Sequence, residues 1–280
     1  MMTHYLVLTS AVGIDEETPD QVAETVNAEP NRLGDCAVEF AVPSDVDIPR
    51  IAGVDVNLVP AGNRRKKLLI ADMDSTMINV ECIDELADFA GVKARVSDIT
   101  ERAMRGELDF DGALRERVAL LAGLPDSALQ ACYDERIRLN PGARTLVQTM
   151  NKFGAFTALV SGGFTYFTGK VAAEAGFAFH QANTLLQENG KLTGKVADPI
   201  LGQQAKLDTL NRLTAEQGIT LADAIAVGDG ANDRAMVEAA GLGVAYHAKP
   251  VLAEAADVVL NHSDLTALLA LQGIAERDYA

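Results

Sequence analysis

The pattern of apolar and polar positions changes along the chain and predicts different kinds of structure in successive regions. In the first 65 residues, short apolar or alternating runs predict strands, and one amphipathic stretch predicts a helix. The strands are expected over 5–9, 37–42 and 54–59, and the helix over 18–26. We therefore expect a small α+β unit over residues 1–65, followed by a linker at the basic residues 64–67.

The next region is almost entirely helical in pattern. Between residues 81 and 153, apolar side chains recur every three or four positions, as at Ile83, Leu86 and Ala87. Another helix is expected to begin at Asn140-Pro141, with Asn140 as N-cap and proline at the first helical position. Because this block separates one strand from the next, it predicts a helical cap inserted at about residues 82–145.

Strands and helices alternate in the last part of the chain. An apolar run over 67–71 and the later runs predict strands separated by helices, and Asn189-Gly190 predicts a hairpin turn. The later strands are expected over 156–160, 224–227, 243–245 and 258–260. This alternation indicates an α/β fold, a Rossmann-like and mostly parallel sheet with helices on both faces, formed by residues 66–280.

Charge and composition restrict the partners. The net charge is −16 and the sequence pI is about 4.6, which argues against nucleic acid or an anionic membrane as a partner. No apolar run approaches the roughly 18 residues of a membrane span, and the acidic start does not resemble a signal peptide. A cytoplasmic location is therefore expected. The three scattered cysteines suggest neither disulfides nor zinc, and the sequence leaves a homodimer open.

Candidate chemistry begins directly after the strand 67–71. Asp72 and Asp74 lie two residues apart, so on an extended backbone their side chains point the same way. Two carboxylates at roughly 4 Å repel by about 4 kcal/mol at an effective dielectric near 20, so the pair needs a cation or a shared proton. Mg²⁺ is a cation that prefers such oxygen ligands.

Two further polar turns are expected at the same edge of the sheet, because the carboxyl ends of parallel strands meet there. One contains Ser161 and Gly162, and the other runs from Gly228 to Asp233. Together with Lys206 they would supply an anion cradle, carboxylates and an ammonium group. This set of groups is typical of metal-assisted phosphoryl transfer through an aspartyl phosphate.

Other interpretations of these turns do not fit the spacing. The turn at 228–233 has Asp233 where a dinucleotide fingerprint has its third glycine. A calcium-binding loop starting at Asp72 would have Met77 at its turn glycine. The sequence contains neither a P-loop motif nor a Gly-x-Ser-x-Gly nucleophile elbow.

At these residues the sequence resembles the haloacid dehalogenase superfamily of phosphotransferases and, within it, the phosphoserine phosphatase family. The resemblance covers about residues 67–270. It rests on the following parts of this sequence: Asp72-Met-Asp-Ser-Thr-Met-Ile-Asn-Val-Glu81, Ala103-Met-Arg-Gly-Glu-Leu-Asp-Phe110, Leu114-Arg-Glu-Arg117-Val-Ala-Leu-Leu121, Ser161-Gly162, Lys206, and Gly228-Asp-Gly-Ala-Asn-Asp233.

The resemblance implies a role for each matching residue. Asp72 would be the nucleophile and Asp74 the acid and then the base. Mg²⁺ would be held by Asp72, the Asp74 backbone carbonyl and Asp229. The residues expected to bind the substrate O-phospho-L-serine fall into two groups, the phosphate ligands Ser161, Gly162, Lys206 and Asn232, and the groups for the serine ammonium and carboxylate, Glu81 and Arg117. Met104 and Phe110 resemble an apolar lid.

The implied activity is Mg²⁺-dependent hydrolysis of O-phospho-L-serine, the last step of L-serine biosynthesis. Two alternatives stay open at this stage. The first is the same chemistry on another small phosphomonoester such as phosphohomoserine, and the second is an amino-acid-binding regulator without turnover. The first 65 residues resemble, weakly, the ACT-type modules attached to bacterial members of the family.

Overall fold

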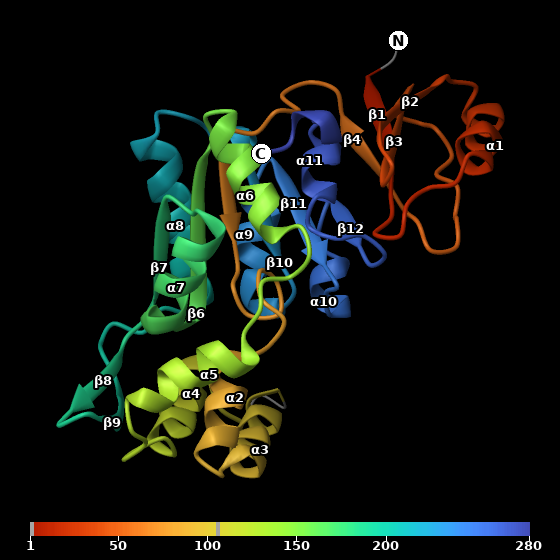
Figure 1. The fold of residues 1–280 in the computed structure, drawn as a ribbon. Helices are drawn as coiled ribbons and strands as arrows, with labels where there is room; N and C mark the ends of the chain where they lie inside the picture. The colour runs from red at the N-terminus through yellow and green to blue at the C-terminus, as the bar shows by residue number, and fades with distance from the viewer. Residues whose placement is uncertain (1–2, 105–106) are drawn as a thin grey trace.

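A parallel six-stranded sheet forms the centre of the molecule. The structure, a computed structural model, describes residues 3–104 and 107–280, apart from the side chain of Met104. The strand order is β12-β11-β10-β5-β6-β7, and every neighbouring pair is parallel (Figure 1). The strands are β5 (Leu68–Ala71), β6 (Phe156–Phe164), β7 (Phe179–Asn183), β10 (Ala224–Gly228), β11 (Leu242–Tyr246) and β12 (Val258–Leu260).

Both faces of this sheet are buried under helices, as continuous apolar strands require. In β5, Leu69 and Ala71 pack on one face with α6 (Ala143–Lys152), α7 (Thr165–Ala175) and α11 (Ala267–Leu271). Leu68 and Ile70 pack on the other face with α8 (Gln203–Glu216), α9 (Arg234–Ala239) and α10 (Pro250–Ala253). All four side chains of β5 are fully buried, so β5 is fixed in register and orientation.

The strand order reverses at β5. From β5 the chain moves to β6 and β7 on one side, and later to β10, β11 and β12 on the other. In open parallel sheets, such a switch point creates a crevice at the carboxyl ends of the strands. The helices α2 (Cys82–Phe89), α3 (Lys93–Met104), α4 (Phe110–Ala119) and α5 (Ser127–Arg136) lie beyond that edge (Figure 1).

A hairpin of β8 (Leu185–Glu188) and β9 (Lys191–Val196) packs beside α4 (Figure 1). Its turn residues Asn189 and Gly190 have φ of 50° and 72°, the left-handed pair that this dipeptide favours. The hairpin expected from the sequence is thus confirmed.

The structure differs from the sequence prediction at the start of α6 and at β7. The helix expected at Asn140-Pro141 begins at Ala143, and its N-cap is Gly142 with φ 79°. The Asn140 side chain instead donates to the carbonyl oxygens of Thr76 at 2.8 Å and Ile78 at 3.1 Å. The strand β7 (Phe179–Asn183) was not expected, because its sequence Phe-His-Gln-Ala-Asn lacks a continuous apolar run.

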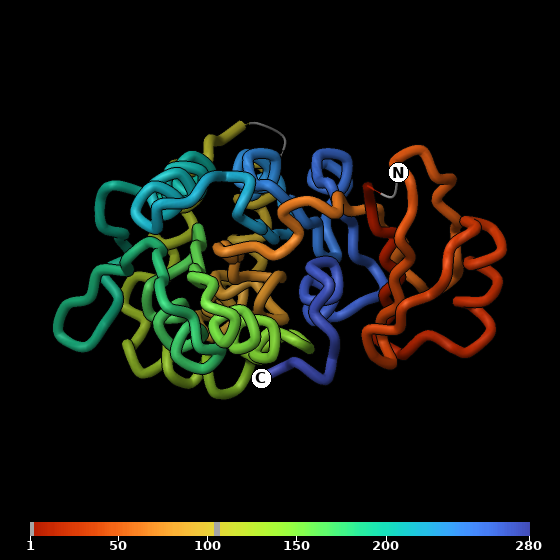
Figure 2. The backbone as a smooth tube through the Cα atoms, turned by 90° about the horizontal axis from the view of Figure 1, so that it is seen from above, coloured from red at the N-terminus to blue at the C-terminus, as the bar shows by residue number. Residues whose placement is uncertain are grey.

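The N-terminal residues form a separate four-stranded antiparallel sheet beside the core (Figures 1 and 2). Its elements are β1 (His4–Thr9), α1 (Glu17–Val26), β2 (Pro30–Gly34), β3 (Ala37–Val42) and β4 (Asp55–Pro60), in the sheet order β2-β3-β1-β4. Leu6 and Leu8 pack towards α1, while Val7 packs with the apolar residues of the core. This sheet therefore has two buried faces. The polar strand β2 was not expected from the sequence.

Side chains of β4 dock this sheet on the edge strand β12. The Asn57 amide donates to the carbonyl of Val259 at 3.2 Å and accepts its N–H at 3.2 Å, as a neighbouring strand would. The Asp55 carboxylate accepts the backbone N–H groups of Asn261 and His262, both at 2.9 Å, and the Ser263 hydroxyl at 2.7 Å. The edge of the parallel sheet is thereby covered instead of left unpaired.

A second set of contacts involves Arg64. Its guanidinium lies 2.6 Å from the carboxylate of Glu39 and 4.2 Å from the ring centre of Tyr5. It also donates to the carbonyl oxygens of Ala270 at 3.1 Å and Leu271 at 2.7 Å, at the end of α11. Because Arg64 is largely buried, this linker residue joins the N-terminal sheet to the core by charge-assisted bonds.

From this arrangement we propose a division of the chain into an N-terminal module, residues 1–65, and a larger unit, residues 66–280, with the cap at about 82–145. The two sheets and the position of α2–α5 support it. Among the helices in the described part of the chain, none combines the length and apolarity that crossing a bilayer requires.

Asp55→Ala should lower the free energy of unfolding by about 3 kcal/mol, because it leaves two backbone N–H groups and a hydroxyl without their charged acceptor. Equilibrium urea unfolding would measure the change. The exposed Asp45→Ala variant in the same module should stay within about 0.5 kcal/mol of the wild type. Equal losses for the two variants would contradict a docking role for Asp55.

Candidate active site

Asp72 directly follows β5 and lies at the switch point of the sheet. Its N–H continues the strand ladder by donating to the Val227 carbonyl of β10 at 3.0 Å. Asp72 is 3% exposed, and its Oδ1 accepts the N–H of Met73 at 2.8 Å. The carboxylate is therefore held at the end of a rigid buried strand and not on a mobile loop.

The chain turns sharply after Asp72 and brings Asp74 back towards the same crevice. Ser75 adopts a left-handed conformation with φ 56°, which is unusual for a residue with a β-carbon. The Asp74 Oδ1 accepts the N–H of Cys82 at 3.1 Å, at the start of α2. The Ser75 hydroxyl donates to Glu81 at 2.8 Å. This turn thus fixes Asp74 and Glu81 relative to each other.

The second polar segment, Ser161–Gly163, lies in the last part of β6, where the pairing with β7 is irregular between Val160 and Phe164. The sequence predicted that this strand ends at Val160, whereas it continues to Phe164. The Ser161 hydroxyl accepts the N–H of Gly163 at 2.8 Å and lies 3.4 Å from Asp74 Oδ2. A β-carbon at Gly163 would approach Asp74 Oδ2 to 2.7 Å, closer than real β-carbons come. Glycine is therefore needed there if Asp74 and Ser161 are to meet.

Asn183, at the end of β7, connects this segment to the one before α8. Its amide donates to the carbonyls of Gly162 at 2.8 Å and Leu201 at 3.1 Å, and its oxygen accepts the Leu201 N–H at 2.8 Å. Asn183 is 2% exposed. The sequence analysis did not select this residue, because an asparagine in a short polar stretch gives no signal without its partners.

The Lys206 ammonium lies in the first turn of α8 and is 2% exposed. It is 2.6 Å from Asp72 Oδ1 and 2.5 Å from Asp233 Oδ1. The other oxygen of Asp233 accepts the backbone N–H groups of Asp229 at 3.2 Å and Gly230 at 3.1 Å. Lys206 and Asp233 therefore connect α8, β5 and the turn after β10 in one buried network.

The electrostatics of the crevice reflect its crowded carboxylates. Burial, with help from Glu81, raises the pKa of Asp74 to about 7. Burial and the neighbouring Asp233 raise the pKa of Asp229 to about 6 and that of Asp72 well above its ordinary value. Burial disfavours the charged ammonium of Lys206, but Asp233 and Asp72 outweigh it and raise its pKa.

The donor set fits a divalent cation. Oxygen atoms of Asp72, Asp229 and Asp233 lie within 4.8 Å of one another, and all three residues are buried. Lys206 alone cannot balance these three charges and that of Asp74, and buried charge is costly unless it is compensated. Hard divalent ions prefer such carboxylate oxygens. Because both oxygens of Asp233 already accept hydrogen bonds, Asp72 and Asp229 are the more available ligands.

Two residues expected to recognise the substrate lie in the cap or directly before it. The exposed Glu81 directly precedes α2, and the half-buried Arg117 lies in α4. Burial lowers the pKa of Arg117, while the nearby carboxylates of Asp84, Glu81 and Asp74 oppose this. The Arg117 Nε donates to the Ala113 carbonyl of its own helix at 3.2 Å. Its charge interacts with that of Glu81, although 36 positions separate the two residues in the sequence.

The lid expected over the crevice is described in part. The Phe110 ring lies against Gly162 and Gly202, since a β-carbon at either glycine would come within 3.1 Å or less of the ring. Phe110 is 37% exposed. The side chain of Met104 lies outside the described residues, as do Arg105 and Gly106. The expected lid role of Met104 therefore stays a prediction. Asn232 lies in the short helix η2 (Ala231–Asp233) and is half-buried.

Comparison with known proteins places these residues within a family. A model of the haloacid dehalogenase-like hydrolases matches residues 69–238. A phosphoserine phosphatase from Haemophilus influenzae is 47% identical over 240 residues, which are 86% of this chain and 74% of that protein. One from Archaeoglobus fulgidus is 45% identical over 218 residues, 77% of this chain, and the chain spans 63% of it.

A solved structure of a phospho-aspartyl intermediate analogue of phosphoserine phosphatase is also similar. It is 41% identical to this chain, with a TM-score of 0.68, and the match covers 73% of this chain and 98% of that one. The fold that the sequence predicted, a mostly parallel α/β sheet of this superfamily, is confirmed.

The melting temperature should be higher in millimolar Mg²⁺ than in a chelator, because a bound cation relieves the repulsion among the buried carboxylates. At a Mg²⁺ concentration of about 100 times Kd, binding adds about 2.7 kcal/mol to the free energy of unfolding. In Asp229→Asn, the metal-free protein should melt at a higher temperature than wild type and respond less to Mg²⁺. Differential scanning calorimetry would measure both effects, with the exposed Asp47→Asn as control. An undiminished response in Asp229→Asn would contradict Asp229 as a ligand.

Proposed function

The chain belongs to the haloacid dehalogenase-like hydrolases and, within them, to the phosphoserine phosphatases, and on this premise we propose that it hydrolyses O-phospho-L-serine to L-serine and phosphate through an aspartyl phosphate on Asp72. It is thus a phosphoric monoester hydrolase, and the reaction would complete L-serine biosynthesis. The observation that carries the proposal is the contact of Lys206 with Asp72, beside the segment in which Ser161 meets Asp74.

The first step requires a nucleophile that is fixed and ionised. Asp72 is held by Lys206 and by the Met73 N–H on Oδ1, which leaves Oδ2 as the attacking atom. The new Oδ2–P bond forms as the bond between phosphorus and the serine oxygen breaks. Ser161, the N–H of Gly162, Lys206 and Asn232 would hold the phosphate oxygens in line for this displacement.

The leaving serine oxygen must receive a proton, and Asp74 is suited to supply it. Because its pKa is raised to about 7, the carboxyl group keeps a substantial protonated fraction near neutral pH. After serine leaves, the Asp74 carboxylate would take a proton from the water that attacks phosphorus. The P–O bond to Asp72 then breaks, and both carboxylates return to their starting state.

A divalent cation supports this chemistry by masking the negative charge of the nucleophile and the phosphate. We propose Mg²⁺, with the Asp72 carboxylate, the Asp74 backbone carbonyl and Asp229 as its protein ligands. Asp233 would act as a positioning residue, because it holds Lys206 and the N–H groups of the turn that carries Asp229.

Recognition of the serine part needs one opposite charge for each end of a zwitterion. Glu81, oriented by Ser75, would bind the ammonium group, and Arg117 would bind the carboxylate through two parallel N–H bonds. Phe110 would exclude water from the crevice when the cap covers it. The substrate is in any case a small molecule, as for the phosphoserine phosphatases in general. We also propose a cytoplasmic location, because the reaction would belong to amino-acid biosynthesis.

Phosphate release from O-phospho-L-serine tests this proposal. Turnover should require Mg²⁺, stop on chelation and return when Mg²⁺ is restored. Asp72→Asn, which keeps the shape of the side chain, should lower kcat by at least about 10³-fold and abolish the acid-stable phosphoenzyme trapped on quenching. Wild-type release at an unchanged rate in chelator, or a phosphoenzyme in Asp72→Asn, would overturn the proposed mechanism.

Glu81→Gln and Arg117→Met should each lower kcat/KM for O-phospho-L-serine by about 10–100-fold, because each removes one charge-assisted contact with the substrate. The kcat/KM for an aryl phosphate, which has neither group, should change little. Phosphohomoserine and phosphothreonine extend the comparison. A wild-type protein that turns over all these esters equally would contradict the assignment of Glu81 and Arg117.

Asn183→Leu should lower kcat by about 10–100-fold with a smaller change in KM, because it frees the Ser161 segment from the one before Lys206. Steady-state kinetics on O-phospho-L-serine would measure this. Asn211→Leu, on the exposed side of α8, is the matched control. A wild-type kcat in a folded Asn183→Leu protein would show that the three bonds of Asn183 serve stability alone.

A further inference from the structure

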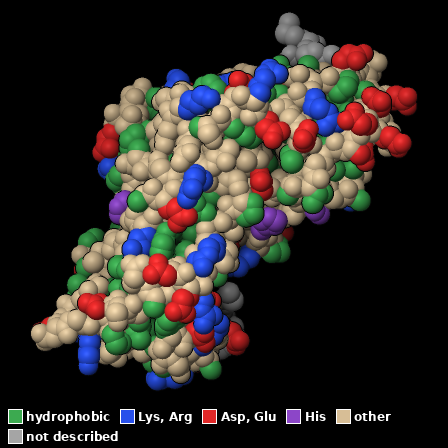
Figure 3. All heavy atoms as spheres, in the orientation of Figure 1, with side chains coloured by type: hydrophobic (Ala, Val, Ile, Leu, Met, Phe, Trp, Pro, Cys, Tyr) green, Lys and Arg blue, Asp and Glu red, His purple; other side chains and the backbone are tan. Residues whose placement is uncertain are grey.

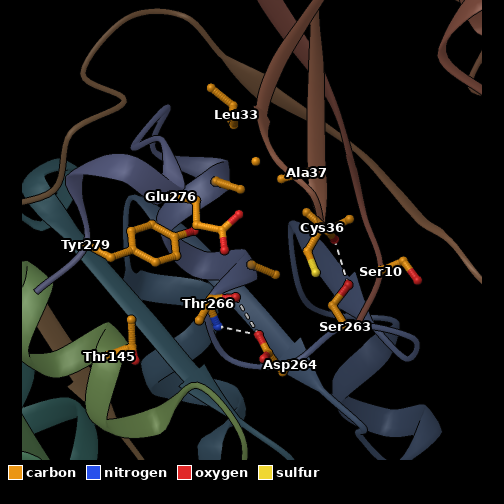
Figure 4. A pocket seen from close by; sticks show the side chains of 14 residues that line it. Ser10, Leu33, Cys36, Ala37, Thr145, Ser263, Asp264, Thr266, Glu276 and Tyr279 are labelled. Atoms are coloured by element: carbon orange, nitrogen blue, oxygen red, sulfur yellow. Dashed lines mark hydrogen bonds between the residues drawn. The ribbon is translucent and has the colours of Figure 1, made fainter. Parts of the chain in front are cut away.

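Much of the surface that an anionic substrate meets is acidic. The chain carries a net charge of −16, and acidic side chains gather on the N-terminal module, where Glu17 and Asp20 lie on α1 (Figure 3). A cavity of about 240 Å³ between that module and the C-terminal segment is lined by Asp264 and Glu276, and none of its described lining residues is Lys, Arg or His (Figure 4). A phosphate ester therefore needs an accessible cation at the crevice itself.

Lys249 is a cation at the crevice to which neither the family resemblance nor the proposed mechanism gives a role. It is the N-cap of α10 and directly precedes Pro250. Its backbone N–H donates to the carbonyl of Asp229 at 2.9 Å, and its carbonyl accepts the N–H groups of Leu252 at 3.0 Å and Ala253 at 3.1 Å. The backbone of Lys249 is thus fixed beside the turn that carries Asp229.

The side chain of Lys249 is held less firmly than its backbone. Its ammonium lies 4.0 Å from Oδ2 of Asp229, at the outer limit of an ion pair, and among the described residues no other carboxylate oxygen lies within that distance. The side chain is 59% exposed, against 11% for that of Asp229. Because the four-carbon stem of lysine is flexible, the ammonium can leave Asp229 for an anion in the crevice.

The charge of Lys249 acts on both sides of the crevice. Burial raises the pKa of Asp229 to about 6, and the Lys249 ammonium opposes this rise. Burial also raises the pKa of Asp84 in the cap helix α2, and the cations that oppose this include Arg117 and Lys249. Asp229 belongs to the core and Asp84 to the cap, so the ammonium lies where these two parts of the molecule face each other.

Two other cations of the crevice are less available to an incoming anion. The Lys206 ammonium is 2% exposed and already lies between two carboxylates. The Arg117 guanidinium is half-buried, and its Nε donates to the Ala113 carbonyl. Lys249 combines an exposed side chain with a single long contact, so its ammonium is the most available of the three.

We propose that Lys249 is a further recognition residue, whose ammonium exchanges Asp229 for the phosphate of the substrate. This rests on the proposed function, in which Asp72 and Asp229 lie at the phosphate end and Glu81 and Arg117 at the serine end. Since Lys249 lies beside Asp229, it acts on the phosphate of any ester. The same ammonium competes with a divalent cation for Asp229, because two cations near one carboxylate repel each other. Lys249 thus strengthens phosphate binding and weakens Mg²⁺ binding.

Two calorimetric titrations of the full-length protein test this without turnover. In Lys249→Met, Mg²⁺ should bind about threefold more tightly than in the wild type, and inorganic phosphate should bind the Mg²⁺-saturated protein about fivefold more weakly, because one charge contact near the surface is lost. Lys249→Arg should keep both affinities near those of the wild type. Lys195→Met, at an exposed position of β9, removes the same charge elsewhere and should change neither affinity. A merely structural role of Lys249 would instead weaken both ligands.

Steady-state kinetics give a second readout. At saturating Mg²⁺, Lys249→Met should raise KM by a similar factor of about five for O-phospho-L-serine and for an aryl phosphate, with little change in kcat, and should reduce the salt dependence of kcat/KM. Weaker binding of both Mg²⁺ and phosphate, unchanged phosphate binding, or a KM effect confined to O-phospho-L-serine would each overturn the proposal. If the wild type released no phosphate, the proposed function would fail, whereas the two titrations would still test Lys249.

Discussion

The buried contact of Lys206 with Asp72 and Asp233 is the interaction on which the rest of the site depends. Carboxylates collected in a protein interior repel one another and lose hydration, so they stay together only when cations compensate them. Lys206 supplies one fixed positive charge from α8, at 2.6 Å and 2.5 Å from the two oxygens. The carboxylates of the crevice still carry more negative charge than Lys206 compensates. This excess favours binding of a divalent ion, and the bound ion in turn favours binding of a phosphate.

The fold makes this network rigid because its residues lie in buried helices and strands or directly after them. β5 lies between β10 and β6, so Asp72 receives neighbours from both directions of the chain. Hydrogen bonds from Asp233 and Asn183 then fix the adjoining segments, and Gly163 leaves the space in which Asp74 and Ser161 meet. Catalysis by positioned groups requires such support, since errors of about 1 Å are costly in rate.

Directional polar contacts join the N-terminal sheet to the core. Asn57 imitates a strand neighbour for β12, Asp55 caps the turn that follows β12, and Arg64 connects Glu39 to the end of α11. Bonds with this directionality hold the two units in one relative position. They also enclose a cavity of about 240 Å³, which residues of both parts of the chain line.

The sequence alone determined the elements with strong periodicity: the strand before Asp72, the helix that carries Lys206, and the hairpin turn. It also located the polar segments at 72–76, 161–163 and 228–233, although the second of these belongs to β6 and is not a turn. It did not reveal β2, β7, the start of α6 or the role of Asn183, because polar residues acquire their meaning from distant partners. Only the tertiary structure decided how β4 docks on β12, that Asp233 holds Lys206, and that a second cavity lies between the N-terminal sheet and the C-terminal segment. The physical reason is range: periodicity and turn preferences act between near neighbours in the chain, whereas hydrogen bonds, burial and charge act between groups that folding brings together.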